Sequence, residues 1–379
     1  MKLNEPKFAF LITLNVVLLL SVVFFLNQKN QPEINYSTPP QLEFNPPPVK
    51  PEPPKDLDEK AASKTITEKD SKEILTWLAA DEREGRMSGK KGNVAAANYI
   101  AEKFEKFGLD VSRQRFRIQR MNPGPYNETG DDFTENIIGI IPGHSKRQII
   151  IGAHMDHIGY GPGMSRSNAR NQIHNGADDN ASGSTVVLEI AEAFSKMEKP
   201  NHTLVFICFS GEEMGLIGSR YYVHQLDRAA RDNIDLMVNF DMVGWLKNQK
   251  AVTIYGIRNM KELVRIVDKV DDNYPFSASP AGASGGSDHA PFGNAGIPFA
   301  FFHTGGHPYY HTPQDDVERI DFEGLTQIAK FAFDMIYEFD KLKVVRTTTV
   351  KYPPLNETVH DHGHPEVKFP IKEGWQIND

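Results

Sequence analysis

The chain has 379 residues, a formal net charge of −8 and one cysteine. The negative charge and the lack of a basic stripe in the sequence argue against a nucleic-acid-binding surface, because contacts to phosphates need clustered Lys and Arg. The single Cys208 excludes an internal disulfide framework and a thiolate zinc cluster, so any bound metal must use His, Asp and Glu ligands.

The N-terminal region has the pattern of a membrane segment. Residues 8–26 are uncharged and largely apolar, and a helix of that length crosses the hydrocarbon core of a bilayer. Lys2 and Lys7 precede this segment, which predicts that residues 1–7 stay in the cytoplasm. No small-residue cleavage site follows it, so we expect a single-pass signal anchor rather than a removed signal peptide. The bulk of the chain would then face the periplasm or the cell exterior.

Two stretches of different composition, residues 27–64 and 344–379, flank the central region. The first is rich in proline and is expected to form a semi-extended linker, with a ligand for a partner domain as the alternative interpretation. The second is a polar tail that contains His360, His362 and His364, for which the sequence predicts no preformed metal geometry. One domain, residues 65–343, is expected between them.

Helix and strand patterns alternate within this domain. The expected helices cover residues 69–80, 93–107, 182–197, 219–228, 260–270 and 322–342. The expected strands cover residues 111–118, 136–141, 148–153, 203–209, 234–240, 252–255 and 297–302. Strands that are apolar on both faces and separated by helices predict an α/β fold, with three αβα layers and a mostly parallel, mixed central sheet.

Three of the expected strands end at potential metal ligands. The first leads directly into His154-Met155-Asp156, and the second leads through Ser210 and Gly211 to the adjacent Glu212 and Glu213. Asp241 follows the third. The carboxyl ends of strands in open α/β sheets are where ligands bind.

The spacing within these segments indicates how the side chains divide their roles. Asp156 lies two positions from His154 in an extended segment, so its carboxylate is expected to accept the imidazole N–H. The side chains of Glu212 and Glu213 diverge, so one of them can bind metal while the other faces the substrate.

Two loop segments complete the set of candidate ligands. A glycine-bracketed acidic turn contains Asp178 and Asp179, and His311 lies in a loop with proline and aromatic neighbours. Two histidines with several carboxylates, one of them bridging, suit a two-cation hydrolase that also needs a free carboxylate to move a proton. The sequence therefore predicts a metal site at this edge of the sheet.

Together these segments resemble peptidase family M28, the zinc aminopeptidases, over about residues 65–342. The resemblance is carried by Ala153-His154-Met155-Asp156-His157, residues 175–183, residues 210–215, Asp241-Met242-Val243-Gly244 and Tyr310-His311-Thr312. It implies a zinc-peptidase-type fold and two Zn²⁺ ions per chain. The implied ligands are His154 and Asp241 for one ion, Glu213 and His311 for the other, and Asp178 as the bridge. Glu212 would be the general base and acid, and Asp156 belongs with it in the predicted catalytic pair.

The resemblance also implies features around the ions. A cis peptide bond would follow Asp178, and Ser287-Asp288-His289 would form part of the pocket wall. Some relatives have a tyrosine that steadies the oxyanion shortly before that stretch, where this chain has Ala281-Gly282-Ala283-Ser284. Tyr309, Tyr310 or the zinc alone would then have this role. Residues 159–163 and 165–172 are expected to rim the pocket.

The implied activity is removal of N-terminal residues from peptides. A single-zinc glutaminyl cyclase of the same fold is one alternative, and the acidic turn together with His154 favours two metals over it. A non-catalytic membrane scaffold is a second alternative, which the complete ligand set disfavours. A two-metal enzyme that cleaves carboxypeptidase-type dipeptides or N-acyl amino acids is the third.

Overall fold

The computed structural model describes residues 57–118, 133–161, 163–168, 171–342, 344–346 and 375–377. The predicted anchor, most of the predicted linker and the histidines of the polar tail lie outside these residues. Within them, no helix combines the length and the apolar character that a membrane span requires.

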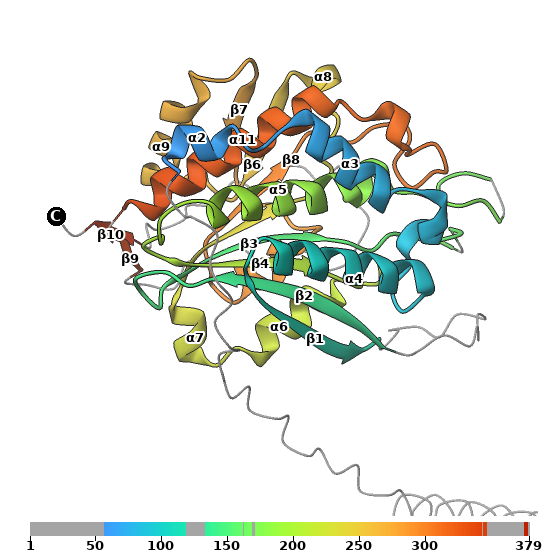
Figure 1. The fold of residues 1–379 in the computed structure, drawn as a ribbon, viewed down its shortest axis with the longest axis horizontal. Helices are drawn as coiled ribbons and strands as arrows, with labels where there is room; N and C mark the ends of the chain where they lie inside the picture. Colours follow the sequence, from blue (N-terminus) through green and yellow to red (C-terminus); the bar gives the residue numbers. More distant parts are fainter. Residues whose placement is uncertain are drawn as a thin grey trace, which may run out of the picture. The chain divides into compact units, whose positions relative to one another are not determined.

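The fold is α/β, with helices on both faces of one mixed sheet, as predicted (Figure 1). The strand order is β1-β2-β4-β3-β5-β8-β6-β7. The strands are β1 (Asp110–Arg117), β2 (Phe133–Ile141), β3 (Gln148–His154), β4 (Thr203–Phe209), β5 (Ile234–Phe240), β6 (Ala251–Tyr255), β7 (Ser277–Pro280) and β8 (Phe299–His303). Strands β9 (Val344–Arg346) and β10 (Trp375–Ile377) form a separate antiparallel pair.

The four central strands, β4, β3, β5 and β8, run parallel, while β1, β2 and β6 pair antiparallel to their inner neighbours. Their residues are buried on both faces because each strand lies between two layers of helices. In β4, Leu204, Phe206 and Cys208 join one apolar core, and Val205, Ile207 and Phe209 join the other. The parallel strands bring their carboxyl ends to one edge of the sheet, where the predicted ligands lie.

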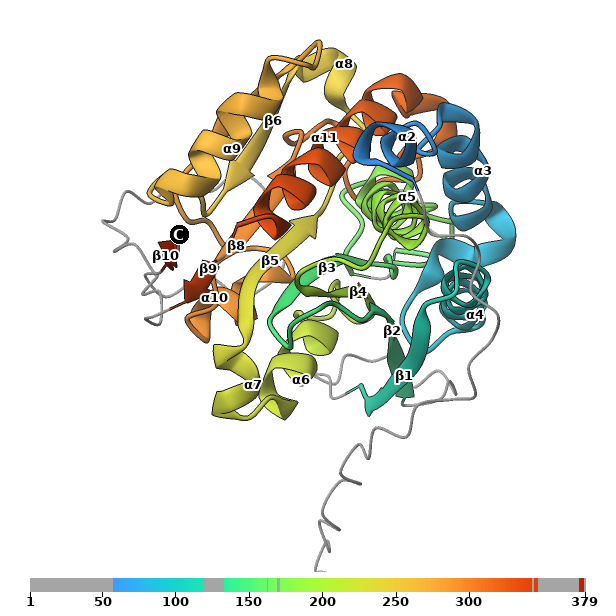
Figure 2. The same cartoon turned by 60° about the vertical axis from the view of Figure 1, so that its left-hand side comes forward.

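The two helical layers differ in size (Figure 2). The larger layer contains α2 (Glu59–Ser63), α3 (Glu68–Leu78), α4 (Lys91–Lys106), α5 (Gly183–Ser195), α9 (Lys261–Asp271) and α11 (Phe322–Asp340). The other face is covered by α6 (Ile217–Gln225), α7 (Arg228–Asp232) and α10 (His289–Asn294). The short helix α8 (Leu246–Gln249) precedes β6. Three further short helical segments are η1 (Asp81–Arg86), η2 (Ala177–Ser182) and η3 (Val317–Arg319).

The folded region starts before the predicted boundary at Thr65. Helix α2 lies inside the stretch predicted to be linker, where Asp58 caps it and Ala62 is fully buried beside α5 and α11. Its sequence carries too few apolar residues to stand out from a linker. Strand β7 and helices α8 and α10 were also missed, because each is too short to show a period.

A buried ionic cluster lies at the opposite end of the strands. His202 Nδ1 lies 2.9 Å from Asp340 Oδ1, and His202 Nε2 lies 3.3 Å from Asp235 Oδ2. Asp235 also pairs with Arg147. Burial alone would lower the pKa of His202, but hydrogen bonds to the two carboxylates raise it to about 9. The protonated imidazole therefore links α11 to β4 and β5.

This cluster should make stability depend on pH. Because the folded pKa of His202 exceeds the unfolded value, its contribution is full below about pH 6.5 and is lost as the pH rises through about 9. The native protein should have a higher free energy of unfolding than His202→Asn at pH 6. This difference between the two proteins should be smaller at pH 10, by on the order of 3 kcal/mol. Urea unfolding at both values measures this difference. Replacement of the exposed His144 by Asn is the matched control, and an equal difference at both pH values would contradict the assignment.

Candidate metal centre

Three parallel strands place ligand-type side chains around one point. His154 is the last residue of β3, Glu212 and Glu213 follow β4, and Asp241 follows β5. All four are buried. His311 reaches the same point from the loop after β8, in a backbone conformation with φ of 54°. The convergence predicted from the strand ends is present in the structure.

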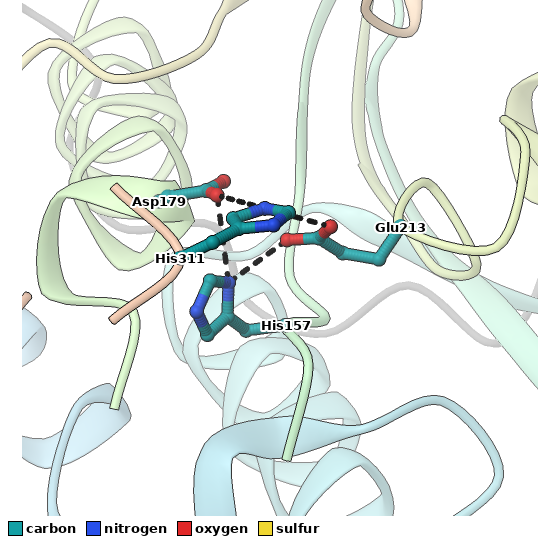
Figure 3. Close-up of side chains that lie close together, drawn as sticks. All are labelled: His157, Asp179, Glu213 and His311. Carbon is teal, nitrogen blue, oxygen red and sulfur yellow. Dashed lines mark hydrogen bonds and ion pairs between the residues drawn. The ribbon is translucent and has the colours of Figure 1, made fainter. Parts of the chain in front are cut away.

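The first group of side chains consists of His157, Asp179, Glu213 and His311 (Figure 3). His311 Nε2 lies 3.1 Å from Asp179 Oδ2 and 3.1 Å from Glu213 Oε2. His157 Nδ1 lies 2.8 Å from Glu213 Oε1 and 3.6 Å from Asp179 Oδ2. All four side chains point toward one common centre.

The second group consists of His154, Asp179 and Asp241. His154 Nε2 lies 3.5 Å from Asp179 Oδ1 and 3.5 Å from Asp241 Oδ1. The two oxygens of Asp179 therefore face different groups, Oδ1 toward His154 and Oδ2 toward His311. This is the geometry that a bridging carboxylate requires.

The structure differs from the sequence prediction at the bridge, since Asp179 occupies the position expected for Asp178. The side chain of Asp178 points away from the two groups, where Oδ1 accepts from Gly244 N at 2.6 Å and Oδ2 lies 3.0 Å from His307 Nε2. The cis peptide bond likewise joins Asp179 to Asn180 rather than Asp178 to Asp179. The adjacent side chains of the turn point in opposite directions, so only Asp179 of the two aspartates faces the ligand groups.

Asp156 and Glu212 lie beside the second group. The nearest acceptor of His154 Nδ1 is the main-chain oxygen of Asp156 at 3.2 Å, and the Asp156 carboxylate is 3.8 Å away. That carboxylate accepts instead from Ser88 Oγ at 2.9 Å and from Glu212 N at 3.2 Å. Asp156 thus fixes the backbone of Glu212, whose Oε2 lies 4.0 Å from His154 Nε2. The predicted carboxylate contact to His154 is replaced by a carbonyl contact.

The electrostatics of the site favour a bound cation. Burial and the charge of Glu213 raise the pKa of Asp179 to about 8. Burial also raises the pKa of Glu212 well above its usual range. Burial lowers the pKa of His157 to about 3, so this imidazole is neutral. A metal ligand must be an ionised carboxylate or a neutral imidazole. A divalent cation at the centre would stabilise the ionised carboxylates, and the imidazole of His157 is already neutral.

The donor set and its spacing fit zinc. Within the described part of the chain, His154 Nε2, Asp179 Oδ2 and Glu213 Oε2 are buried and make no hydrogen bond. Imidazole and carboxylate ligands lie about 2.0–2.2 Å from zinc, which separates tetrahedral ligand atoms by roughly 3.3 Å. The separations of 3.1 and 3.5 Å within the two groups agree with that value. The residues present therefore fit two zinc positions that share Asp179.

Residues that the sequence analysis missed hold the site together. The guanidinium of the buried Arg86 donates to the main-chain oxygens of Leu78, Met155, Asn175 and Gly176. Asp315 accepts from the main-chain N–H groups of both Asp178 and Asp179 at 2.9 and 3.0 Å. These two side chains join the β3 loop, the acidic turn and the His311 loop. Their contacts join residues that are far apart in the sequence, so no local sequence pattern predicts the roles of Arg86 and Asp315.

The two tyrosines offered for the oxyanion role lie in different places. Tyr310 is buried, its ring is 3.9 Å from the ring of His311, and burial with the nearby carboxylates raises its pKa. Tyr309 packs against Trp245 and beneath Arg319. Of the two, Tyr310 is therefore the residue at the site.

Other predicted neighbours of the site are also present. Ser287, Asp288 and His289 are buried, and Asn239 near the end of β5 donates to the Ser287 hydroxyl at 2.9 Å. On the other side, Met164 O lies 3.2 Å from His311 Nδ1. Residues 163–168 therefore border the His311 loop.

A family model described as Peptidase family M28 matches residues 136–336, more than half of the chain. The chain belongs to peptidase family M28. The match includes every member of the two ligand groups. The family assignment made from the motifs is thus confirmed.

Curated relatives of this M28 chain include an aminopeptidase. Aminopeptidase YwaD of Bacillus subtilis (strain 168) is 32% identical over 241 residues, which cover 58% of this chain and 47% of the relative. Leupeptin-inactivating enzyme 1 of Streptomyces exfoliatus is 31% identical over 232 residues, which cover 59% and 45%. The chain spans about half the length of these relatives.

Solved structures show the same fold. An aminopeptidase from Aneurinibacillus sp. strain AM-1 matches with a TM-score of 0.61 at 20% identity, covering 80% of this chain and 99% of that one. A Bacteroides thetaiotaomicron glutaminyl cyclase matches with a TM-score of 0.60 at 22% identity, covering 72% and 98%. Both activities occur on this fold, so the likeness alone does not choose between them.

The two adjacent aspartates of the turn should behave differently when replaced. Asp179→Asn should lower the zinc content, because it removes a carboxylate that faces both ligand groups. Asp178→Asn is the matched variant and should keep the zinc content of the unsubstituted protein, since its contacts are to Gly244 and His307. Metal analysis after dialysis measures both. Full zinc content in Asp179→Asn, or its loss in Asp178→Asn, would contradict the bridging assignment.

Proposed function

We propose that this protein is a two-zinc aminopeptidase that hydrolyses the N-terminal peptide bond of peptides. The observation that carries the proposal is Asp179, whose two oxygens face two separate ligand groups. We infer that His154 and Asp241 hold one ion, that Glu213 and His311 hold the other, and that Asp179 bridges them. The aminopeptidase names of relatives such as YwaD support the substrate class.

The chain's own residues would divide the chemistry as follows. Bound zinc supplies a Lewis acid for the scissile carbonyl and lowers the pKa of water. Glu212 is the general base, because its buried carboxylate lies between the two ions' ligands, in a cluster with His154 and Glu213, while neither group that contains Asp179 includes it. It takes a proton from the attacking water and returns it to the leaving amine. Asp156 is a positioning residue, since it holds the Glu212 main-chain N–H.

Tyr310 is the protein group that we assign to the oxyanion. Its ring packs at 3.9 Å from that of His311, and burial together with the neighbouring carboxylates raises the pKa of its phenol and keeps it protonated. A protonated phenol can donate a hydrogen bond to a developing oxyanion. This role would be performed by Tyr310 instead of the tyrosine that relatives place before the Ser287 stretch.

The glutaminyl cyclase alternative has support from the fold alone. A cyclase with one zinc would need one ligand group, whereas this site presents two groups that meet at Asp179. The two groups therefore favour hydrolysis with a pair of ions. Release of pyroglutamyl peptide from a glutaminyl substrate, with no cleavage of aminoacyl amides, would establish the cyclase instead.

Replacement of the proposed base tests the mechanism. Glu212→Gln should keep two zinc ions and lower turnover of aminoacyl p-nitroanilides by about 10²–10⁴-fold, because it removes proton transfer. Glu192→Gln on the surface of α5, where Glu192 pairs with Lys196, is the matched control and should keep full turnover. Steady-state kinetics with metal analysis measure both quantities. Undiminished turnover in Glu212→Gln would exclude it as the base.

We also propose that residues 8–26 anchor the protein in a membrane, with the peptidase domain outside the cytoplasm. The support is the uncharged apolar run and the lysines that precede it. The full-length chain should sediment with membranes and resist extraction by alkaline carbonate. Protease added to intact cells or spheroplasts should digest the domain. A chain that stays protected, or that lacks residues 8–26 after expression, would contradict this topology.

A further inference from the structure

The two ligand groups are unequal in size. The group around Asp241 contains three side chains, of which Asp179 is shared. The group around His311 contains four, because His157 joins it. The motif that contains His157 implies no role for this residue.

His157 Nδ1 lies close to two members of the group around His311. Its Nδ1 lies 2.8 Å from Glu213 Oε1 and 3.6 Å from Asp179 Oδ2, values on either side of the roughly 3.3 Å expected between tetrahedral zinc ligands. Figure 3 shows this nitrogen directed at the centre that the other three side chains face. A residue that only oriented Glu213 by a hydrogen bond would not need to face Asp179 as well.

The backbone around His157 is built for this placement. Its main-chain N–H donates to Arg86 O, and its ring packs edge-on against the ring of His311 with centroids 5.5 Å apart. Gly176 has φ of 58°, and a Cβ there would clash with the His157 ring and with the main-chain oxygen of Asp179. The ring and the acidic turn therefore come into contact only because residue 176 lacks a side chain.

We propose that His157 Nδ1 is the fourth protein ligand of the ion held by Asp179, Glu213 and His311. This inference rests on the proposed two-zinc function. If His157, Asp179, Glu213 and His311 all bound zinc, that position would have the four protein ligands typical of a structural site, whereas His154, Asp179 and Asp241 would supply three at the other position, as in catalytic sites. Glu212 lies beside this three-residue group, with its Oε2 4.0 Å from His154 Nε2. The two ions would thus have different tasks, one holding the site together and the other facing the substrate.

Zinc affinity separates ligation from simple positioning. The test uses a protein with Asp241→Asn, which weakens zinc binding at the position of His154 and Asp241. In this background, the protein that retains His157 is compared with the protein that also carries His157→Asn. Asparagine is chosen because its amide can still donate a hydrogen bond to Glu213. Loss of an outer hydrogen bond costs about 10–100-fold in metal affinity, so loss of a direct ligand should cost at least about 100-fold. Competition with a chelating dye measures the dissociation constant for zinc. His174→Asn is the matched control, as this buried imidazole bonds to Ser165 and Gln172 and belongs to neither group.

X-ray absorption of the unsubstituted zinc protein gives a second reading that does not depend on the variant folding. It should find a total of three imidazole ligands for the two ions, from His154, His157 and His311. If His157 is only a hydrogen-bond donor, the total should be two. A count of two, or a loss of less than about tenfold in His157→Asn, would overturn this assignment alone. Failure of the intact protein to bind zinc would overturn the proposed function with it.

Discussion

The structure depends on the concentration of negative charge at one edge of the sheet. Carboxylates buried within a few ångströms of one another repel and are poorly solvated, so each is costly unless a cation lies among them. The buried acidic residues at this edge are Asp156, Asp178, Asp179, Glu212, Glu213, Asp241, Asp288 and Asp315. Two divalent ions would attract these carboxylates and offset their mutual repulsion. Metal binding would therefore increase the free energy of unfolding of the domain.

The scaffold must hold these groups at fixed positions whether or not the ions are bound. Arg86 does much of this, since its guanidinium donates to four main-chain oxygens from three separate segments while contributing a buried positive charge. Burial lowers its pKa to about 10, and the surrounding carboxylates oppose that shift, so it remains protonated at neutral pH. Asp315 has the complementary task of accepting from the acidic turn. The site is thus preorganised by contacts between loops that are distant in sequence.

The sequence was sufficient for the elements whose pattern is local. Apolar runs of five to seven residues identified the parallel strands because both faces of those strands are buried. The same runs located His154, Glu212, Glu213 and Asp241, because a ligand at the end of a strand follows directly from where the strand stops. His311 lies in a loop with no such periodicity and was identified from its proline and aromatic neighbours, and the motif resemblance then assigned it to an ion.

The remainder depended on tertiary contacts. Two adjacent aspartates are equivalent in a motif, and only the hydrogen bonds of the turn to Asp315 and Gly244 direct Asp179 inward and Asp178 outward. His157 follows a recognised motif, yet its approach to Glu213 is set by the close packing of Gly176. Helix α2 is stabilised by α5 and α11 rather than by its own composition. Each miss therefore reflects an interaction between segments that a linear pattern does not contain.

The central claim is that two ions share the carboxylate of Asp179, and anomalous diffraction from crystals of the zinc-loaded protein tests it most directly. Data collected on both sides of the zinc absorption edge should show two peaks, one on either side of Asp179. One peak should lie near His154 and Asp241, and the other near Glu213 and His311. A single peak, or two peaks of which neither contacts Asp179, would contradict the account.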